Sequence, residues 1–388
     1  MSAVERRAVF SLAGIYSTRL LGLFLILPVF ALYAQTLEDY TPRLAGLALG
    51  IYGLTQACLQ LPFGIASDRF GRKPVIAAGL VLFAIGSVVA ALADSMWGVL
   101  IGRALQGAGA VSAAVTALVA DLTRETQRTK AMAVIGISVG ASFLISIPLG
   151  SALNTIIGVP GIFWLTAVLA VASLLILWLA VPPPIASTRR ERSPVLKELA
   201  VVLRDGRLLQ LNIGIFALHA ALTATFVVLP TALVEQAGLP ANEHAALYLP
   251  LMLLSALPLF PIISLSERRH WQHGVFAGSV LVLCLAQAAL ALQNGSLLGI
   301  GISLLVFFMA FNVLEASLPS LVSKMAPANA KGAAIGVYST FQFLGAFVGG
   351  DRGGWLHEHY GTSAVFAGAA LLTGIWFFVS MWPQRSSA

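Results

Sequence analysis

Long apolar runs separated by short polar breaks extend along almost the whole chain. Twelve of these runs reach about the 20 residues that a helix needs to cross a bilayer. One long polar segment, residues 182–207, follows the sixth run and divides the twelve into two sets of six. The pattern predicts an all-α membrane protein with twelve transmembrane helices. The runs lie at residues 9–34, 44–66, 74–93, 97–120, 131–153, 160–181, 209–233, 245–265, 273–292, 296–322, 332–356 and 361–382.

The two sets of six carry a weak internal repeat. The stretch ALVADLTRETQRTKAMAVIG, from Ala117, matches SLVSKMAPANAKGAAIGVYS, from Ser320, at an offset of 203 residues. Chance similarity between apolar helices is the alternative, but the midpoint loop and the equal numbers of runs favour duplication. We therefore expect two pseudo-symmetric six-helix bundles, at 1–181 and 208–388, joined by a cytoplasmic linker at 182–207. Such an arrangement is typical of alternating-access transporters.

Composition and charge agree with a membrane location. The chain is 58% hydrophobic and 10% charged, against about 25% charged in soluble domains. If the N-terminus, every second loop and the C-terminus share one side, nineteen of the 23 lysines and arginines lie on that side, and only Arg43 lies on the other. The positive-inside rule then places both termini in the cytoplasm. This topology explains the net charge of +7 without a nucleic-acid partner.

Enzymatic chemistry is not indicated. The sequence contains no HExxH motif and no spaced cysteine and histidine ligands. Its two cysteines, Cys58 and Cys284, both fall inside apolar runs. We expect no catalytic site, no metal and no cofactor, and a monomer whose partners are a small-molecule substrate, protons and membrane lipids.

The loop after the second run carries a specific motif. Its sequence GIASDRFGRKP closely resembles the signature loop of the major facilitator superfamily, G-x-x-x-D-R-x-G-R-[RK]. Its two glycines permit a tight turn and close helix contact. The resemblance implies a conformational switch in which Arg72 pairs with Asp121, at the end of the fourth run; a solvated helix end is the alternative for Asp121. The motif residues are Gly64, Asp68, Arg69, Gly71, Arg72 and Lys73.

Four further stretches resemble proton-coupled members of this superfamily. IGRALQGAGAV, with Arg103 and Gln106, resembles their fourth-span motif, and LLGLFLILPV, GIYGLTQACLQLPFG and RTKAMAVIG resemble the drug:proton antiporter branch. The whole chain looks closest to YajR-type transporters. It departs from them because it stops at MWPQRSSA without their C-terminal soluble domain, and because the antiporter motif G-P-x-x-G-G of the fifth span is degraded to SIPLGS.

The resemblance implies a proton-coupled exporter of small amphipathic compounds in a bacterial inner membrane, working by rocker-switch alternating access. Two alternatives remain open. One is a proton symporter or uniporter for a small metabolite, and the other is a non-transporting membrane receptor on the same fold.

Two arginines lie inside apolar runs, where an ionisable residue marks a functional site by default. Arg19 lies in the middle of the first run and Arg103 in the fourth. Because arginine stays protonated, neither can carry the transported proton. Each could shift the pKa of a nearby carboxylate, bind an anion or organise a polar network. The alternative is that each only anchors two helices through hydrogen bonds.

Glu315 is the clearest titratable group at depth, one turn past Asn312 in the tenth run. Burial favours the neutral form of a carboxyl group, so Glu315 could load a proton; a hydrogen bond in helix packing is the alternative. His219, in the seventh run, is a second candidate. The alternative is that this lone histidine is a buried core residue whose hydrogen bonds are satisfied by its neighbours. Gln56 and Gln60 share one face of the second run at i, i+4 spacing, where we expect them to line a cavity or to bridge helices.

The stretch FLGAFVGGDRGGWL, residues 343–356, places Asp351 and Arg352 between two glycine pairs in the eleventh run. Helical rise of about 1.5 Å per residue puts Asp351 near the outer end of this run. Three hypotheses are open: both charges snorkel to the outer interface, Asp351 pairs with Arg43 as an outer gate, or Asp351 carries the proton. Successive helical side chains point about 100° apart, so the two are not expected to share a partner face.

Overall fold

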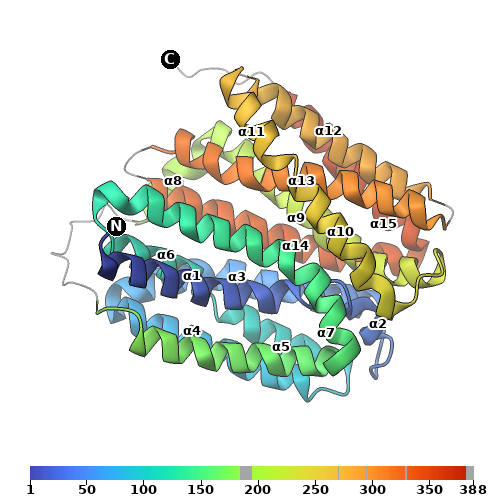
Figure 1. The fold of residues 1–388 in the computed structure, drawn as a ribbon, viewed down its shortest axis with the longest axis horizontal. Helices are drawn as coiled ribbons and strands as arrows, with labels where there is room; N and C mark the ends of the chain where they lie inside the picture. The colour runs from blue at the N-terminus through green and yellow to red at the C-terminus, as the bar shows by residue number, and fades with distance from the viewer. Residues whose placement is uncertain (184–194, 270, 294, 328–329, 382–388) are drawn as a thin grey trace. The chain divides into compact units, whose positions relative to one another are not determined.

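The computed structural model describes residues 1–183, 195–269, 271–293, 295–327 and 330–381, and these residues are almost entirely helical (Figure 1). Ten of their helical segments are long and apolar enough to cross a membrane. The segment Glu125–Leu179 holds both the fifth and the sixth predicted runs, so the ten segments account for eleven runs. The first run supplies the remaining helix, and the predicted twelve-helix architecture is confirmed.

The helices group into two compact units. The first consists of Met1–Tyr40 and Ile51–Arg192, and the second of Thr41–Gly50 and Ser193–Ala388. Helix α3 (Pro42–Phe70) begins in the second unit and continues in the first. The other helices of the first unit are α1 (Ala3–Phe24), α2 (Phe30–Ala34), α4 (Arg72–Ala91), α5 (Met96–Ala108), α6 (Ser112–Asp121), η1 (Glu125–Gln127) and α7 (Arg128–Leu179).

The second unit contains α8, which lies inside the predicted linker 182–207, and the helices that come after it. Residues 184–194 of that linker, with three of its basic residues, lie outside the described part of the chain. The helices are α8 (Val195–Arg204), α9 (Gly206–Glu235), η2 (Ala241–Glu243), α10 (His244–Ala256), α11 (Leu259–Arg268), α12 (Gln272–Ala291), α13 (Leu297–Met325), α14 (Lys331–Tyr360) and α15 (Thr362–Met381).

Three of the predicted runs form broken helices. The breaks between α1 and α2 and between α10 and α11 coincide with Pro28 and Pro258. A proline has no N–H to donate, and its ring clashes with the carbonyl group four residues earlier. The fourth run breaks between α5 and α6 at Gly109, where a Cβ atom would clash with Gly79 O of α4.

Two glycines with positive φ reverse the chain direction. Gly71 (φ +94°) forms the turn between α3 and α4, and Gly158 (φ +66°) interrupts α7. Residues with a Cβ atom rarely adopt this backbone conformation. Figure 1 shows the chain turning back within α7, which therefore has two legs that correspond to the fifth and sixth predicted runs.

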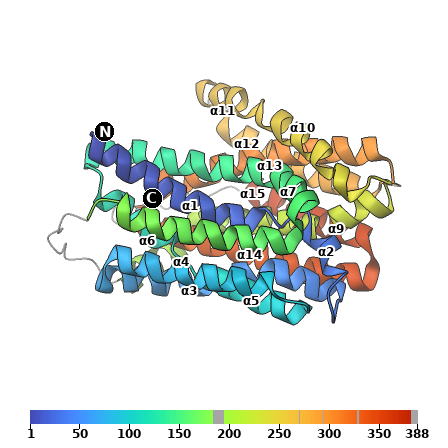
Figure 2. The same cartoon turned by 60° about the horizontal axis from the view of Figure 1, so that its bottom comes forward.

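The internal repeat is visible in the packing. Arg128 begins α7 and Lys331 begins α14, and these positions are related by the same offset of 203 residues. In the first unit α1 packs along α7, and in the second unit α9 packs along α14. Figure 2 shows α1 lying between the two legs of α7. Apolar side chains such as Leu118 fill the interior, whereas Ile137 and Phe260 are exposed, as expected for helices solvated by lipid.

Candidate functional site

The signature loop brings Arg72 into contact with two carboxylates. Arg72, at the start of α4, is 9% exposed. Its Nε donates a hydrogen bond to Oδ2 of Asp121, at the end of α6, at 3.1 Å. It also forms an ion pair with Asp68, one turn earlier, and donates from Nη1 to Ser67 Oγ at 2.6 Å. The loop therefore gathers one buried cation and two partly exposed carboxylates where α3, α4 and α6 meet.

The other loop residues have separate contacts. Lys73 donates from Nζ to Val181 O, just beyond the end of α7, at 2.5 Å. Arg69 is exposed, and its guanidinium carbon lies 5.4 Å from the centre of the Phe70 ring. Gly64 lies within α3, where a Cβ atom would make an ordinary 3.6 Å contact with Ala113. The backbone conformation therefore favours glycine at Gly71, whereas at Gly64 a Cβ atom would fit against α6 without a clash.

Glu5, which sequence reasoning did not single out, joins the start of α1 to the loop after α6. It is 5% exposed and accepts hydrogen bonds from Arg124 Nε at 2.9 Å, from Arg124 Nη2 at 3.1 Å and from the Arg124 backbone N–H at 3.0 Å. It also accepts from Ser2 N at 2.6 Å in a capping box, whose S-x-x-E pattern was the available sequence signal. The hydrogen bonds from Arg124 hold the pKa of Glu5 well below its ordinary value.

Replacing Glu5 with Gln should destabilise the first unit in a pH-dependent way. Because the folded-state pKa of Glu5 is lowered, from an unfolded value of about 4.3, ionised Glu5 stabilises the fold above that pH. This contribution is lost as the pH falls through the folded-state pKa. The thermal midpoint of the variant in detergent should lie below that of the wild type at about pH 7, with a smaller difference at about pH 3. The exposed Glu125→Gln change is the control, and an equal difference at both pH values would contradict the prediction.

Arg19 and Gln56 belong to one buried polar cluster in the first unit. Arg19 is 4% exposed and donates to Gln56 Oε1 at 2.8 Å and Tyr52 OH at 3.0 Å, both on α3, and to Ser112 Oγ on α6 at 3.2 Å. Gln56 Nε2 also donates to Ser112 Oγ at 3.2 Å. Gln60, one turn further along α3, is buried, but its Oε1 accepts no hydrogen bond from the described residues. Gln56 therefore links α3 to α1 and α6 through hydrogen bonds.

Arg103 lies beside this cluster. It is fully buried on α5, donates to Gln106 Oε1 at 2.8 Å, and its guanidinium carbon lies 4.9 Å from the centre of the Tyr52 ring. Gln106 Nε2 donates in turn to Ser87 Oγ on α4 at 2.8 Å. Tyr52 thus contacts both buried arginines, with its hydroxyl group toward Arg19 and its ring toward Arg103.

In the second unit, Gln342 connects Glu315 and His219. Gln342 Nε2, on α14, lies 2.8 Å from His219 Nε2 on α9 and donates to Glu315 Oε1 on α13 at 3.4 Å. His219 Nε2 and Glu315 Oε2 are 3.9 Å apart, and the two side chains are 7% and 27% exposed. Asn312 instead donates to Ser255 Oγ on α10 at 3.1 Å. The structure thus joins Glu315 to His219 and gives Asn312 a different partner.

Asp351, 16% exposed, lies near two arginines. Arg43 Nε is 3.6 Å from Asp351 Oδ1, and Arg352 Nε is 3.6 Å from Asp351 Oδ2; these arginine side chains are 53% and 67% exposed. Glu358 Oε2 also accepts from the Arg43 backbone N–H at 3.0 Å. Asp351 and Arg352 meet although successive helical positions point about 100° apart, because the long arginine side chain can lie back along the helix surface.

Glycines allow α14 to approach its neighbours backbone to backbone. A Cβ atom at Gly350 would clash with Gly46 O in the first turns of α3, and one at Gly349 would clash with Ala220 O of α9. Small residues permit this close approach between membrane helices. The four glycines around the charged pair therefore divide between two neighbours: Gly350 and Gly354 face α3, and Gly349 and Gly353 face α9.

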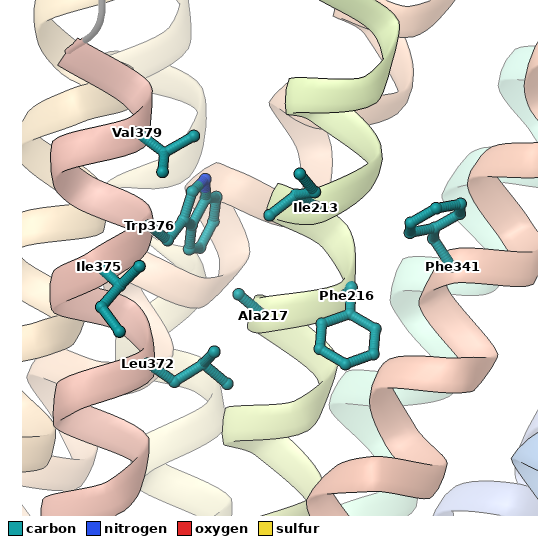
Figure 3. A pocket seen from close by; sticks show the side chains of 8 residues that line it. All are labelled: Ile213, Phe216, Ala217, Phe341, Leu372, Ile375, Trp376 and Val379. Carbon is teal, nitrogen blue, oxygen red and sulfur yellow. The ribbon is translucent and has the colours of Figure 1, made fainter. Parts of the chain in front are cut away.

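Two cavities in the second unit lie away from these groups. One has a volume of about 280 Å³ and is lined by side chains of α9, α14 and α15, among them Phe216, Phe341 and Trp376 (Figure 3). Its lining is apolar apart from the indole N–H of Trp376. The other, of about 450 Å³, includes His273 and Lys324. Neither cavity is lined by a predicted site residue.

Among the residues that sequence reasoning missed, Tyr52, Ser112 and Gln342 complete the clusters around Arg19 and Glu315. Gln342 had a usable signal, because it is a polar glutamine inside an apolar run, as Gln56 and Gln60 are. Tyr52 and Ser112 had none, since tyrosine and serine are common in membrane helices, and only their contacts with Arg19 distinguish them.

The sequence profile of the Major Facilitator Superfamily matches residues 12–350. The chain belongs to the Major Facilitator Superfamily. Among its relatives in this superfamily is Inner membrane transport protein YajR of Escherichia coli (strain K12), 45% identical over 381 residues that cover 98% of this chain and 84% of YajR. Multidrug resistance protein MdtH of Yersinia enterocolitica is 28% identical, over 87% of this chain and 84% of MdtH.

Two solved structures share the fold. A bacterial homologue of the human lysosomal transporter Spinster, in an inward-facing and unoccupied conformation, superposes with a TM-score of 0.78 at 16% identity, over 98% of both chains. The nucleoside transporter NupG gives a TM-score of 0.76 at 16% identity, over 96% of this chain and 99% of that one. The family match, the relationship to YajR and the ten membrane-spanning segments together make the protein a multi-pass integral membrane transporter.

Sequence reasoning found no enzymatic motif, but it overlooked one pattern that occurs in hydrolases. GISVG, residues 136–140, matches G-x-S-x-G, which in some hydrolases presents a nucleophilic serine on a strand-to-helix turn. Ser138 instead lies within α7, where its hydroxyl group donates to Ile135 O at 2.7 Å. The pattern lacks the required context, and the relatives are named as transporters.

Proposed function

We propose that this chain is a proton-coupled secondary transporter that exports small amphipathic compounds by rocker-switch alternating access. Membership of the Major Facilitator Superfamily and the relationship to proteins named for multidrug resistance support this proposal. The proposal includes the predicted orientation, with both termini in the cytoplasm of a bacterial inner membrane, and a monomer that needs only substrate, protons and lipid.

The environment of the Glu315 side chain is the main observation that supports proton coupling. Its carboxylate lies inside the tenth predicted span, where an ionised side chain is costly. Its hydrogen-bond and ion-pair partners among the described residues are Gln342 and His219, and Tyr338 also lies within electrostatic reach. No described lysine or arginine forms an ion pair with it. Because Gln342 donates toward His219 Nε2, the histidine accepts and is neutral in this arrangement. A carboxyl group with neutral neighbours at this depth can gain a proton in one conformation and lose it in another.

The cluster at Arg72 supports a conformational switch. Arg72 lies between Asp68 and Asp121, which belong to different helices, so it ties the ends of α3, α4 and α6 together. A buried ion pair contributes little net stability but can define one of two alternative arrangements. In this proposal the pair between Arg72 and Asp121 forms in one state of the transport cycle and separates in the other.

The proposal can be tested with the full chain in proteoliposomes. A panel of cationic, anionic and neutral amphiphiles would be measured for flux with and without an imposed pH gradient, while a dye reports internal pH. We expect at least one compound to move against the proton flow and only slowly without the gradient. Flux that is independent of the gradient would indicate a uniporter, and proton flow in the same direction would indicate a symporter. Absence of flux for the whole panel would favour the receptor alternative.

We also propose that Arg43 and Asp351 form an outer gate. Exposed ion pairs contribute about 0–1 kcal/mol, so Arg43→Ala should change the accessibility of the adjoining helix by up to about fivefold. The measurement is labelling of Ala45→Cys, a buried position on α3, by an impermeant maleimide in a background without Cys58 and Cys284. Arg352→Ala is the matched control because Arg352 and Asp351 both belong to α14, so their ion pair does not link α14 to α3. Unchanged labelling in Arg43→Ala would remove the gate hypothesis.

A further inference from the structure

The charge on Arg19 has neutral partners throughout the described part of the first unit. Its three hydrogen-bond acceptors are an amide oxygen and two hydroxyl oxygens, on Gln56, Tyr52 and Ser112. The described carboxylates of this unit lie at or beyond the ends of the apolar runs, and none forms an ion pair with Arg19. A buried guanidinium remains charged, and an uncompensated buried charge is strongly destabilising.

The cluster around Arg19 also has more donors than acceptors. Ser112 Oγ accepts from both Arg19 Nη1 and Gln56 Nε2, and Tyr52 OH accepts from Arg19 Nη2. The hydroxyl protons of Ser112 and Tyr52 are therefore left to donate, and no acceptor for them is found among the described residues. Arg19 Nε is buried and also has no hydrogen-bond partner there. Three donors thus surround one positive charge.

We propose that Arg19, Tyr52 and Ser112 form a binding site for one singly charged anion, which we call the Arg19 anion site. One negative charge would balance the guanidinium, and its lone pairs would accept from Arg19 Nε–H and from the two hydroxyl groups. Two sources share this chemistry. One is the carboxylate of a transported solute, which rests on the proposed transport function, and the other is an inorganic anion such as a halide.

The test measures anion binding to the purified full chain in detergent and requires no transport. Sodium bromide and sodium acetate would be titrated separately, with a bulky sulfonate keeping the ionic strength constant, while the thermal midpoint is recorded. An anion that binds the folded state raises the midpoint in a saturable way. Anomalous diffraction from crystals grown in bromide would then locate the bound ion relative to Arg19 Nε.

Variants separate the site from general salt effects. Tyr52→Phe and Ser112→Ala each remove one donor and should weaken apparent affinity about tenfold, and Arg19→Gln should abolish the saturable rise. Ser173→Ala, which removes a buried hydroxyl group bonded to Thr18 outside the cluster, is the matched control and should titrate like the wild type. If Arg19→Gln does not fold, Tyr52→Phe and Ser112→Ala decide the question.

The outcomes are distinct. Saturable binding of bromide assigns the site to inorganic anions, and binding of acetate alone assigns it to the carboxylate of a solute. The proposal is overturned if neither anion raises the midpoint, or if Tyr52→Phe and Ser112→Ala titrate like the wild type. Because binding is measured directly, a failure of the flux assay leaves this result unaffected, and a failure here leaves proton-coupled flux untouched.

Discussion

Glu315→Gln should remove the response of transport to a proton gradient while leaving the fold intact. Glutamine has nearly the shape of a protonated glutamate and still offers Gln342 an oxygen acceptor, so the contacts between α13, α14 and α9 can persist. It cannot lose a proton, however, and the carrier would be held in one protonation state. We expect gradient-driven flux to fall at least about tenfold, equivalent to a barrier increase of about 1.4 kcal/mol.

Two further measurements make the Glu315→Gln result specific. Exchange of labelled for unlabelled substrate without a gradient should survive in the variant, because it needs no net proton transfer. The exposed Glu243→Gln change, on the same unit, should leave gradient-driven flux as in the wild type. If Glu315→Gln retained its full gradient response, the proton would be carried by another group and the proposed coupling site would be wrong.

Adding one methyl group to α14 should have different consequences at two adjacent positions. At Gly349 the new Cβ atom would clash with backbone of α9, and at Gly350 it would clash with backbone in the first turns of α3. Overpacking of this kind costs about 1–3 kcal/mol. We expect Gly349→Ala to lower the thermal midpoint by loosening the packing of α9 on α14. Gly350→Ala should instead displace residues 42–50 of α3 and increase labelling of Ala45→Cys.

The control for this pair lies on the same helix. A Cβ atom at Gly332, near the start of α14, would have no atom within 4 Å. Gly332→Ala should therefore change neither the thermal midpoint nor the labelling. If Gly350→Ala behaved like Gly332→Ala, the close approach between α3 and α14 would not be a feature of the folded protein in the membrane.

The fold was largely predictable because hydrocarbon imposes a simple rule on the chain. Every spanning segment must satisfy its own backbone hydrogen bonds, so length and apolar character were enough to locate the helices, and the repeat offset matched the starts of α7 and α14. Helix breaks were less predictable. Pro28 and Pro258 both lie at breaks, yet Pro148 and Pro319 lie inside helices, because neighbouring helices and local adjustments can compensate for a lost hydrogen bond.

The site was predictable as a set of residues but not as a set of contacts. Polar side chains in apolar runs, such as Arg19 and Glu315, can be identified from the sequence because placing them in hydrocarbon costs free energy. Their partners come from other helices, and helical spacing within one run does not determine which neighbours meet. Glu315 thus contacts Gln342 rather than grouping with Asn312, its neighbour one turn away.

The glycines that bring α3 against α14 also affect how fast that contact could open and close. Interdigitated side chains must change rotamers when two helices part, and each one regains or loses conformational entropy as it does so. A contact made by backbone at Gly46 and Gly350 has no such side chains to rearrange. The surfaces of α3 and α14 could therefore separate and rejoin without slow side-chain rearrangement. In that case the ion pair at Arg43 would set the relative populations of the closed and open contact, and not the rate at which they interconvert.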